Sequence, residues 1–214
     1  MNKLNLGCGF DHRDGYLNAD SFQECKPDVL INIEETPWAF RDNAYQHILL
    51  KHVLEHVGQS YSSFKAIMQE LYRITANQGI IEIHIPHFRH DTFWSDPTHV
   101  RAFTLLTFQM MSKAQNDEWI QRKANFSMIA YDMNVNFEVV KAIQVYDNHW
   151  AQKKENNNIS DEKLFEHSLE KWNVIKELQV TIKAIKPFQQ SEHNVQKSFT
   201  HLSSISEHQL MHDQ

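Results

Sequence analysis

The chain opens on a short apolar strand that ends in two closely spaced glycines. Residues 3–9 read Lys-Leu-Asn-Leu-Gly-Cys-Gly, and the two leucines predict a buried strand. Because glycine has no Cβ, Gly7 and Gly9 allow backbone angles and close approaches that other residues block. Open α/β sheets bind nucleotide-like ligands at such turns, at the carboxyl ends of parallel strands. A Gly-x-Gly pair alone is weak evidence, so the segments that follow decide its meaning.

Composition predicts a soluble globular protein and excludes several classes. The chain has 214 residues, of which 41% are hydrophobic and 22% charged, as expected for one domain with decorations. A net charge of -6 argues against a general nucleic-acid binder. We expect no membrane span and no signal peptide, because no apolar stretch is long enough for either. Only Cys8 and Cys25 are present, so a disulfide framework is not expected and the predicted location is cytoplasmic.

The first 86 residues alternate strands with loops or helices. After the opening strand, further strands are predicted at 16–20, 28–33, 46–51 and 80–85. Such alternation favours a parallel sheet. Only ten residues separate Gly9 from Asp20, too few for a helix and a strand, so the first crossover helix is reduced to a loop. Two later strands, at 136–146 and 177–186, are expected to extend or reverse the sheet at one edge.

The clearest helix is predicted over 60–76. Its apolar residues recur at helical spacing, namely Phe64, Ile67, Met68, Leu71 and Ile74. Ser60 is the expected N-cap, and Asn-Gln-Gly at 77–79 the stop signal. Shorter helices are expected from Thr104 to 111 and around 164–172, the second capped by Ser160 or Asp161. We assign residues 1–187 to the folded domain. Residues 188–214 are rich in Gln, Ser and His, which predicts a disordered tail.

Four features follow one another in a fixed order. They are the glycine turn, the carboxylate of Asp20 ending the second strand, the polar Asn32 in the third, and His-Val-Leu-Glu-His at 52–56 after the fourth. This order resembles the class I S-adenosylmethionine-dependent methyltransferases. Residues 5–9 look like their first motif. Leu-Tyr-Arg-Ile at 71–74, followed by 77–79, is similar to their helix and turn before strand five. The resemblance covers residues 2–87 and, more loosely, the strand pair at 136–186.

The resemblance implies an α/β fold of the Rossmann-like methyltransferase type. Its mostly parallel seven-stranded sheet would have a reversed edge strand, a shortened first helix and an acceptor lid inserted after strand five, at 87–134. The implied cofactor is S-adenosyl-L-methionine, held by Asn5, Gly7, Cys8, Gly9, Asp20, Asn32, Ile33, Lys51 and His52. Asp20 stands where the family carboxylate accepts both ribose hydroxyls. Asn32 replaces an Asp near the adenine, and Asp11 replaces a third glycine, so both depart from the family pattern.

The stretch from 84 to 101 is rich in histidine and acidic residues. It begins at the carboxyl end of strand five, where ligands lie in such sheets. Methyl transfer to oxygen or nitrogen releases a proton, so His87, Asp96 and His99 are candidate catalytic bases. A polar lid without any catalytic side chain is the alternative. Metal binding by His87, His90, Asp91 and His99 is a third reading, but their spacing matches no defined site, and no metal is predicted.

Residues 52–56 also match His-x-x-Glu-His, an inverted zinc-protease signature. That chemistry needs both histidines on one helical face, whereas here the first histidine directly follows a strand. Glu55 and His56 are therefore expected to be structural, at a helix start where the dipole favours a carboxylate.

The predicted function is a methyltransferase enzyme acting on a small-molecule or sugar-like acceptor. The alternative is a non-catalytic binding or regulatory protein on the same scaffold, supported by Asn32 and the missing third glycine. A nicotinamide dehydrogenase is disfavoured, because the turn lacks Gly-x-x-Gly spacing and a helix to receive a pyrophosphate. The expected partners include neither nucleic acid nor membrane. The acceptor and the choice between monomer and homodimer stay open.

Overall fold

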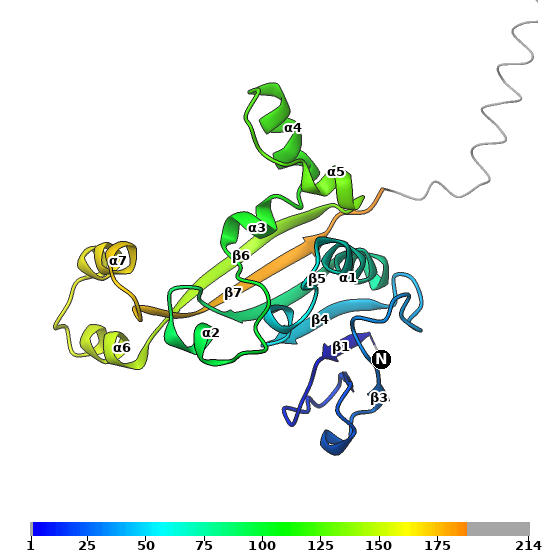
Figure 1. The fold of residues 1–214 in the computed structure, drawn as a ribbon, viewed down its shortest axis with the longest axis horizontal. Coiled ribbons are helices and arrows are strands. Elements are labelled where there is room, and N and C mark those ends of the chain that lie inside the picture. The colour runs from blue at the N-terminus through cyan, green and yellow to red at the C-terminus, as the bar shows by residue number, and fades with distance from the viewer. Residues whose placement is uncertain (1, 188–214) are drawn as a thin grey trace, which may run out of the picture.

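The structure, a computed structural model, describes residues 2–187. Its seven strands form one sheet in the order β3-β2-β1-β4-β5-β7-β6 (Figure 1). They are β1 (Lys3–Leu6), β2 (Leu17–Asp20), β3 (Val29–Leu30), β4 (Tyr45–Lys51), β5 (Thr75–Pro86), β6 (Phe137–Tyr146) and β7 (Ile175–Ala184). The parallel register pairs Leu6 with Ala19 and Lys51 with His84. The carboxyl ends of β1, β2, β4 and β5 therefore meet at one edge.

Strand β7 runs antiparallel to both of its neighbours, β5 and β6. The other pairings, from β3 across to β5, are parallel. The predicted fold class is thereby confirmed, and the position of the reversal is sharpened, since β7 lies one place inside the outer strand β6. The shortened first helix is also confirmed, because residues 7–16 form turns and loop and contain no helix.

Several predicted element boundaries differ from those in the structure, and two of the differences have a clear local cause. Helix α1 (Tyr61–Ile74) begins as expected, with Ser60 Oγ accepting from the Ser63 N–H, but it ends early because Thr75 already pairs with Tyr45 in the sheet. Strand β3 is much shorter than the predicted 28–33. Asn32 accepts from the Glu34 N–H and donates to the Glu35 carboxylate, and this local turn ends the strand.

The segments after β5 are mostly short helices. They are α2 (Asp91–Ser95), α3 (Leu105–Gln109), α4 (Lys113–Gln121), α5 (Ile129–Met133), α6 (Asn148–Glu155) and α7 (Asp161–Glu170). Helix α3 starts next to Thr104 as predicted, and of the two caps expected for α7 the structure shows Ser160. The sequence analysis did not predict α6, which buries no residue and so shows no apolar stripe. None of the helices within residues 2–187 is long and apolar enough to cross a membrane.

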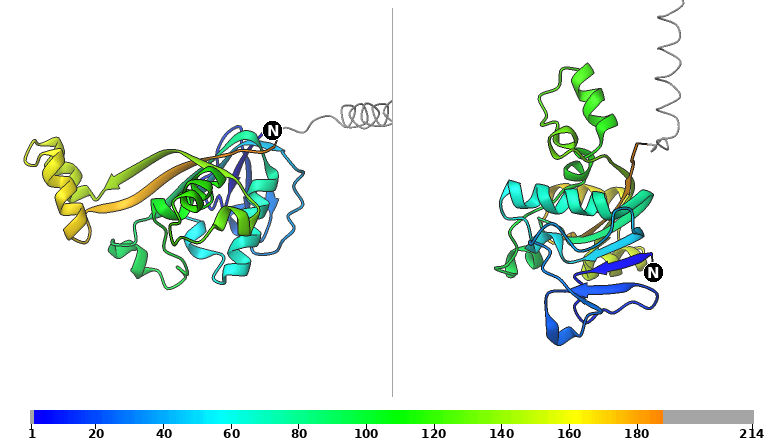
Figure 2. Two further views of the ribbon diagram at one scale, coloured as in Figure 1. Left: turned by 90° about the horizontal axis from the view of Figure 1, so that it is seen from above. Right: turned by 90° about the vertical axis from the view of Figure 1, so that its right-hand side faces the viewer.

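The hydrophobic core lies on one face of the sheet. Leu4, Ile48, Ile81 and Val180 are fully buried there, each from a different strand. Helices α1, α3 and α5 cover this face, as Figure 2 shows from the side. From Phe103 onward the 87–134 insertion contributes to this same core. The opposite face carries the alternate residues of the strands, and many of these are polar.

Glu70 joins α1 to the loop before β4. It is 8% exposed, and its carboxylate accepts hydrogen bonds from the Trp38 N–H at 2.6 Å and from the Arg73 guanidinium at 2.6 and 2.7 Å. Arg73 also donates to the carbonyls of Trp38 and Phe40. The hydrogen bond from Arg73, helped by the Trp38 amide, lowers the pKa of Glu70. Its stabilising effect is therefore complete above the ordinary pKa of glutamate and is lost as the pH falls through the lowered value.

We predict that Glu70→Gln lowers the free energy of unfolding at neutral pH by roughly 1–3 kcal/mol. The loss of stability in acid should also become shallower, because one coupled carboxylate is gone. Urea denaturation across the acid range measures both effects. Glu118→Gln is the matched control, since Glu118 and Arg122 also pair along a helix but are exposed, and its effect should stay within about 0.5 kcal/mol. Equal effects of the two changes would refute the buried role of Glu70.

Candidate active site

The turn after β1 needs both of its glycines. Gly7 has φ 72° and Gly9 has φ 49°, in the left-handed region that side chains disfavour. The N–H groups of Gly7 and Cys8 both donate to the Ala19 carbonyl, at 2.8 and 3.1 Å, so the turn folds back onto β2. A Cβ on Gly7 would lie 2.4 Å from Cγ2 of Val53, whereas the space beside Gly9 is open. Gly7 therefore serves packing, and Gly9 leaves room for a ligand.

Asp20 lies beside this turn, at the carboxyl end of β2. One of its carboxylate oxygens accepts from the Gly9 N–H and the other from the Phe22 N–H, each at 2.8 Å. These two bonds fix the carboxylate against the backbone. Each oxygen keeps a further lone pair, so the group can still accept two hydroxyl hydrogens from a ligand.

Three other residues predicted to bind the cofactor, Asn5, Asn32 and Ile33, lie in different environments. The Asn5 side chain is 3% exposed and donates to the Asp11 carbonyl and to Asn18 Oδ1, which ties the loop to β2. Ile33 is buried in the core, and Asn32 is exposed in the loop after β3. Gly7, Cys8, Gly9 and Asp20 are thus brought together at one turn. The cofactor contacts of all these residues stay predictions.

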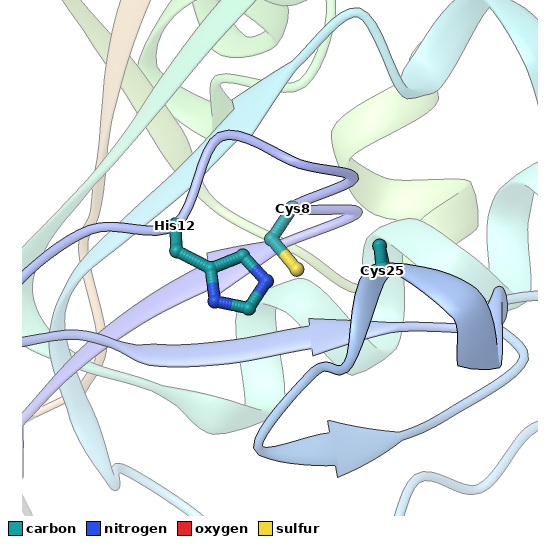
Figure 3. A group of neighbouring side chains, drawn as sticks. All are labelled: Cys8, His12 and Cys25. Atoms are coloured by element: carbon teal, nitrogen blue, oxygen red, sulfur yellow. The ribbon is translucent and has the colours of Figure 1, made fainter.

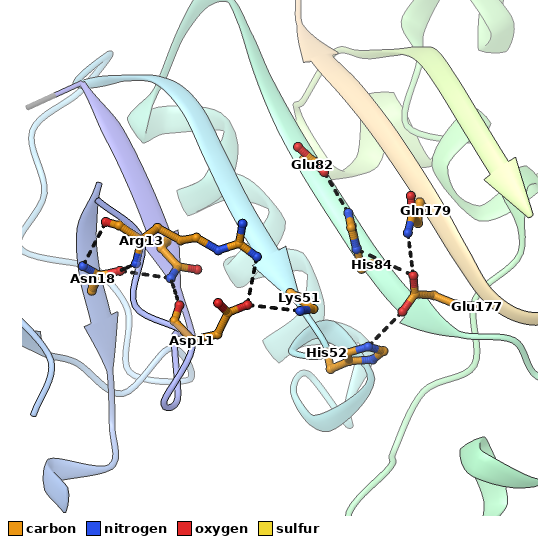
Figure 4. A network of polar contacts seen from close by, with 10 residues as sticks. Asp11, Arg13, Asn18, Lys51, His52, Glu82, His84, Glu177 and Gln179 are labelled. Atoms are coloured by element: carbon orange, nitrogen blue, oxygen red, sulfur yellow. Dashed lines mark hydrogen bonds and ion pairs between the residues drawn. The ribbon is translucent and has the colours of Figure 1, made fainter. Parts of the chain in front are cut away.

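Lys51 and His52, at the end of β4, belong to a polar network on the open face of the sheet (Figure 4). Lys51 Nζ lies 3.1 Å from a carboxylate oxygen of Asp11. His52 places Nε2 2.9 Å from Glu177 and Nδ1 3.3 Å from Glu55. Glu177, followed by Glu55, raises the pKa of His52 to about 9. At neutral pH His52 is therefore a cation held between two carboxylates, and no free base.

A cavity of about 280 Å³ lies next to His52. Its lining comes from the ends of β4 and β5, the start of β7 and the loop around α2, namely His52, Glu55, His56, Pro86, Thr92, Asp96, His99, Lys176 and Glu177. Thr92, Asp96 and His99 are the residues of the 87–134 insertion that border it. Two of the three predicted bases, Asp96 and His99, therefore line one cavity.

His87, the third predicted base, is not among the lining residues of this cavity. Its Nδ1 accepts a hydrogen bond from the Arg89 N–H at 3.2 Å, and burial lowers the pKa of His87 to about 4. A ring with so low a pKa is a weak base at neutral pH. His99 instead donates from Nδ1 to the Phe93 carbonyl at 2.6 Å. In the neutral form of this ring the lone pair is therefore on Nε2, which lies 4.0 Å from Asp96, and this geometry suits a base better than that of His87.

The chain was also compared with known proteins. No family model and no curated protein matches it. Similar solved structures include an S-adenosylmethionine-dependent methyltransferase from Archaeoglobus fulgidus, with TM-score 0.49 and 15% identity over 85% of both chains. YcgJ from Bacillus subtilis has TM-score 0.47 and 14% identity, over 86% of this chain and 92% of YcgJ. A putative methyltransferase from Listeria monocytogenes has TM-score 0.47 and 15% identity, over 86% and 91%. Similarity at this level of sequence identity does not assign a function to the chain.

The strand order and the reversed β7 decide the fold on their own. The fold is that of the class I S-adenosylmethionine-dependent methyltransferases. Within this methyltransferase fold, the segment 52–56 does not form the zinc-protease arrangement. His52 has φ 56° and is followed by the short 3-10 helix η2 (Leu54–His56), so the two histidines point to different partners. His52 contacts Glu177, and the His56 ring packs against His99.

Glu177 is the main lining residue that the sequence analysis missed. It lies near the start of β7, more than a hundred residues after the β4 end that it contacts. Alternation of polar and apolar residues in β7 shows that Glu177 faces away from the core, but it names no partner. Lys176, which also lines the cavity, was missed for the same reason.

Cys8 packs under the glycine turn after β1. Its Sγ, the Sγ of Cys25 and a ring nitrogen of His12 lie within 4.8 Å of one another (Figure 3). Burial, followed by the nearby Cys25 and Asp20, raises the pKa of Cys8 to about 12. The thiol therefore stays protonated at neutral pH, and Cys8 is the small buried hydrophobe that the sequence predicts.

The two glycines give a matched test of the turn. Gly9→Ala should cost about 1–2 kcal/mol of unfolding free energy, because alanine disfavours positive φ. Gly7→Ala carries the same penalty, and the clash with the buried Val53 should add about 1–3 kcal/mol. Chemical denaturation of the two variants measures the difference. Equal unfolding free energies of the two variants would show that the Val53 side chain can move aside without an energetic penalty.

Thiol labelling tests the environment of Cys8. In a Cys25→Ser variant, Cys8 is the remaining thiol. We expect native Cys8 to react with a disulfide reagent at about pH 8 at least a hundredfold more slowly than in the unfolded chain, because so little thiolate is present. Similar rates in the two states would mean that the thiol is exposed or activated.

Proposed function

We propose that the chain is an enzyme that transfers a methyl group from S-adenosyl-L-methionine to a small acceptor. The observation that carries the proposal is the fixed carboxylate of Asp20 beside the open glycine turn. A carboxylate with free lone pairs at the end of β2 is suited to a pair of ribose hydroxyls. No helix follows β1, so the turn has only its backbone N–H groups and neighbouring strand ends to offer a ligand.

The cofactor would lie along the carboxyl edge of the sheet. In this proposal Gly7, Cys8 and Gly9 hold its amino-acid end through the backbone, and Asp20 holds the ribose. Asn32 and Ile33 lie toward the adenine, and Lys51 and His52 toward the sulfonium. His52 belongs both to this row and to the lining of the cavity. The reactive methyl group would therefore point toward the cavity.

The acceptor would occupy the cavity. Its volume of about 280 Å³ is at the small end for ligand sites, which supports a small metabolite or a single sugar-like unit. Methyl transfer proceeds by in-line displacement at the sulfonium carbon, so the protein contributes mainly positioning. The acceptor proton would pass to His99 Nε2, whose lone pair is left free by the bond from Nδ1 to Phe93. Asp96 is an exposed carboxylate of the same lining and is the second choice.

Calorimetry tests cofactor binding. The wild-type chain should bind S-adenosylmethionine and S-adenosylhomocysteine but not NAD. Asp20→Ala should weaken both adenosyl ligands at least tenfold, about 1.4 kcal/mol. Asp20→Asn keeps an oxygen that can accept from the Gly9 N–H, so it controls for a collapse of the turn. This variant should also bind both adenosyl ligands more weakly than the wild type. Asp14→Ala is the control, since Asp14 is an exposed carboxylate of the same loop.

The remaining outcomes separate the alternatives. If neither adenosyl ligand binds at millimolar concentration, the methyltransferase proposal is refuted. Binding of NAD would favour a dehydrogenase. Binding without methyl transfer to any of a broad panel of hydroxyl and amine acceptors would favour the non-catalytic scaffold protein. Unchanged affinity in Asp20→Ala would place the ribose elsewhere.

A further inference from the structure

The Glu55 carboxylate is buried and lacks a hydrogen-bond partner among the described residues. Glu55 is 1% exposed, and no group within residues 2–187 hydrogen-bonds to either of its side-chain oxygens. Within the part of the chain that the structure describes, its single ion-pair contact is with His52 Nδ1 at 3.3 Å, and His52 makes a shorter contact of 2.9 Å with Glu177. Burying a charge without full compensation is costly. Because Glu55 lines the cavity, a cation bound there would satisfy it.

Two histidines lie next to this carboxylate. Glu55, His56 and His99 each offer one ligand atom, and these atoms lie within 4.8 Å of one another. The rings of His56 and His99 meet edge to face with centroids 4.6 Å apart. All three residues line the cavity. The fold thus brings η2 and the segment after α2 together around one point.

Hydrogen bonds leave Nε2 of both histidines free to bind a metal. Thr98 Oγ1 donates its hydrogen to Asp96 at 2.6 Å, so it must accept from His56 Nδ1–H at 2.8 Å. His99 Nδ1–H donates to the Phe93 carbonyl, which can only accept. In the neutral form of each ring, the form that binds a metal, the proton is therefore on Nδ1 and the lone pair on Nε2. Metal-binding histidines are oriented by such partners on their second nitrogen.

We propose that Glu55, His56 and His99 bind a divalent transition metal, with Zn²⁺ the ion of best fit. Two imidazoles and one carboxylate form the ligand set of many catalytic zinc sites, which leave a further position open for water or substrate. Manganese and iron accept the same ligands but bind more weakly in the general affinity order. The open position would face the cavity.

The site adds to the proposed function without depending on it. A bound ion would take the His99 lone pair otherwise assigned to the acceptor proton. A hydroxyl or water on the ion would then lose its proton more readily, because the metal lowers its pKa. Zinc binding is measured without cofactor or acceptor, so failure of the metal site leaves the methyltransferase proposal standing, and the reverse also holds.

The test is a zinc titration of the full chain. After treatment with a chelator and dialysis, the wild-type chain should bind one Zn²⁺ by calorimetry and retain it on gel filtration. Glu55→Gln and His99→Gln should each weaken zinc binding at least tenfold. Loss of even a supporting outer partner of a metal ligand costs roughly that much affinity, and these residues are proposed as ligands themselves. His87→Gln is the matched control, a histidine of the same insertion outside the cavity, and should bind zinc as the wild type does.

Cobalt separates this site from the Cys8, His12 and Cys25 cluster. Co²⁺ in the wild-type chain should show visible d–d bands without the intense thiolate charge-transfer band that cysteine ligands give. This readout on the wild type stays decisive even if a variant fails to fold. Absence of zinc binding, a thiolate band, or binding that survives both Glu55→Gln and His99→Gln overturns the proposal.

Discussion

The structure depends on a sheet with one apolar face, which carries the core, and one largely polar face. Parallel sheets are usually covered on both sides, but here Ile81, Ile83 and Ile85 face the core while Glu82 and His84 face outward. Polar side chains on an open face are stable only if water or neighbours satisfy them. The neighbours do so in this fold, and the resulting network crosses from the β1–β2 loop to β7. The contacts that satisfy the polar side chains of this face are therefore the same contacts that position Lys51 and His52.

The lack of a helix between β1 and β2 also determines how the carboxyl edge of the sheet is held together. A helix after β1 would supply a positive dipole end and a row of free N–H groups. Without it, the Ala19 carbonyl holds the glycine turn, and Asp20 bonds to Gly9 and Phe22. On the other side, His52 is fixed by Glu177 from the reversed strand. The antiparallel β7 thus contributes more than sheet closure, because its reversed direction brings its first residues to the carboxyl edge.

Local signals in the sequence predicted much of this architecture. The Ser60 cap, the helix start near Thr104, the glycine turn and the reversed late strand all follow from short patterns or from the family resemblance. Helix α6 was missed because it has no buried side to create a pattern. The cavity could not be predicted, since Glu177, His56 and His99 meet only after long-range folding. Nor could His87 be told from His99, because the fold decides that Nδ1 of His87 accepts from a backbone N–H whereas Nδ1 of His99 donates to a backbone carbonyl.

The segment 52–56 shows why a local motif does not fix a chemistry. On a regular helix, His-x-x-Glu-His would present both histidines to one ion. Here the strand β4 runs up to His52, whose positive φ turns the chain before η2 starts. His52 is thereby directed to the polar network, whereas Glu55 and His56 meet His99, a residue that no local spacing connects to them. In the proposed metal site this segment supplies one imidazole and the carboxylate, and the second imidazole comes from another part of the fold. Whether such a segment makes a site is decided by the backbone before it and by the loop that closes over it.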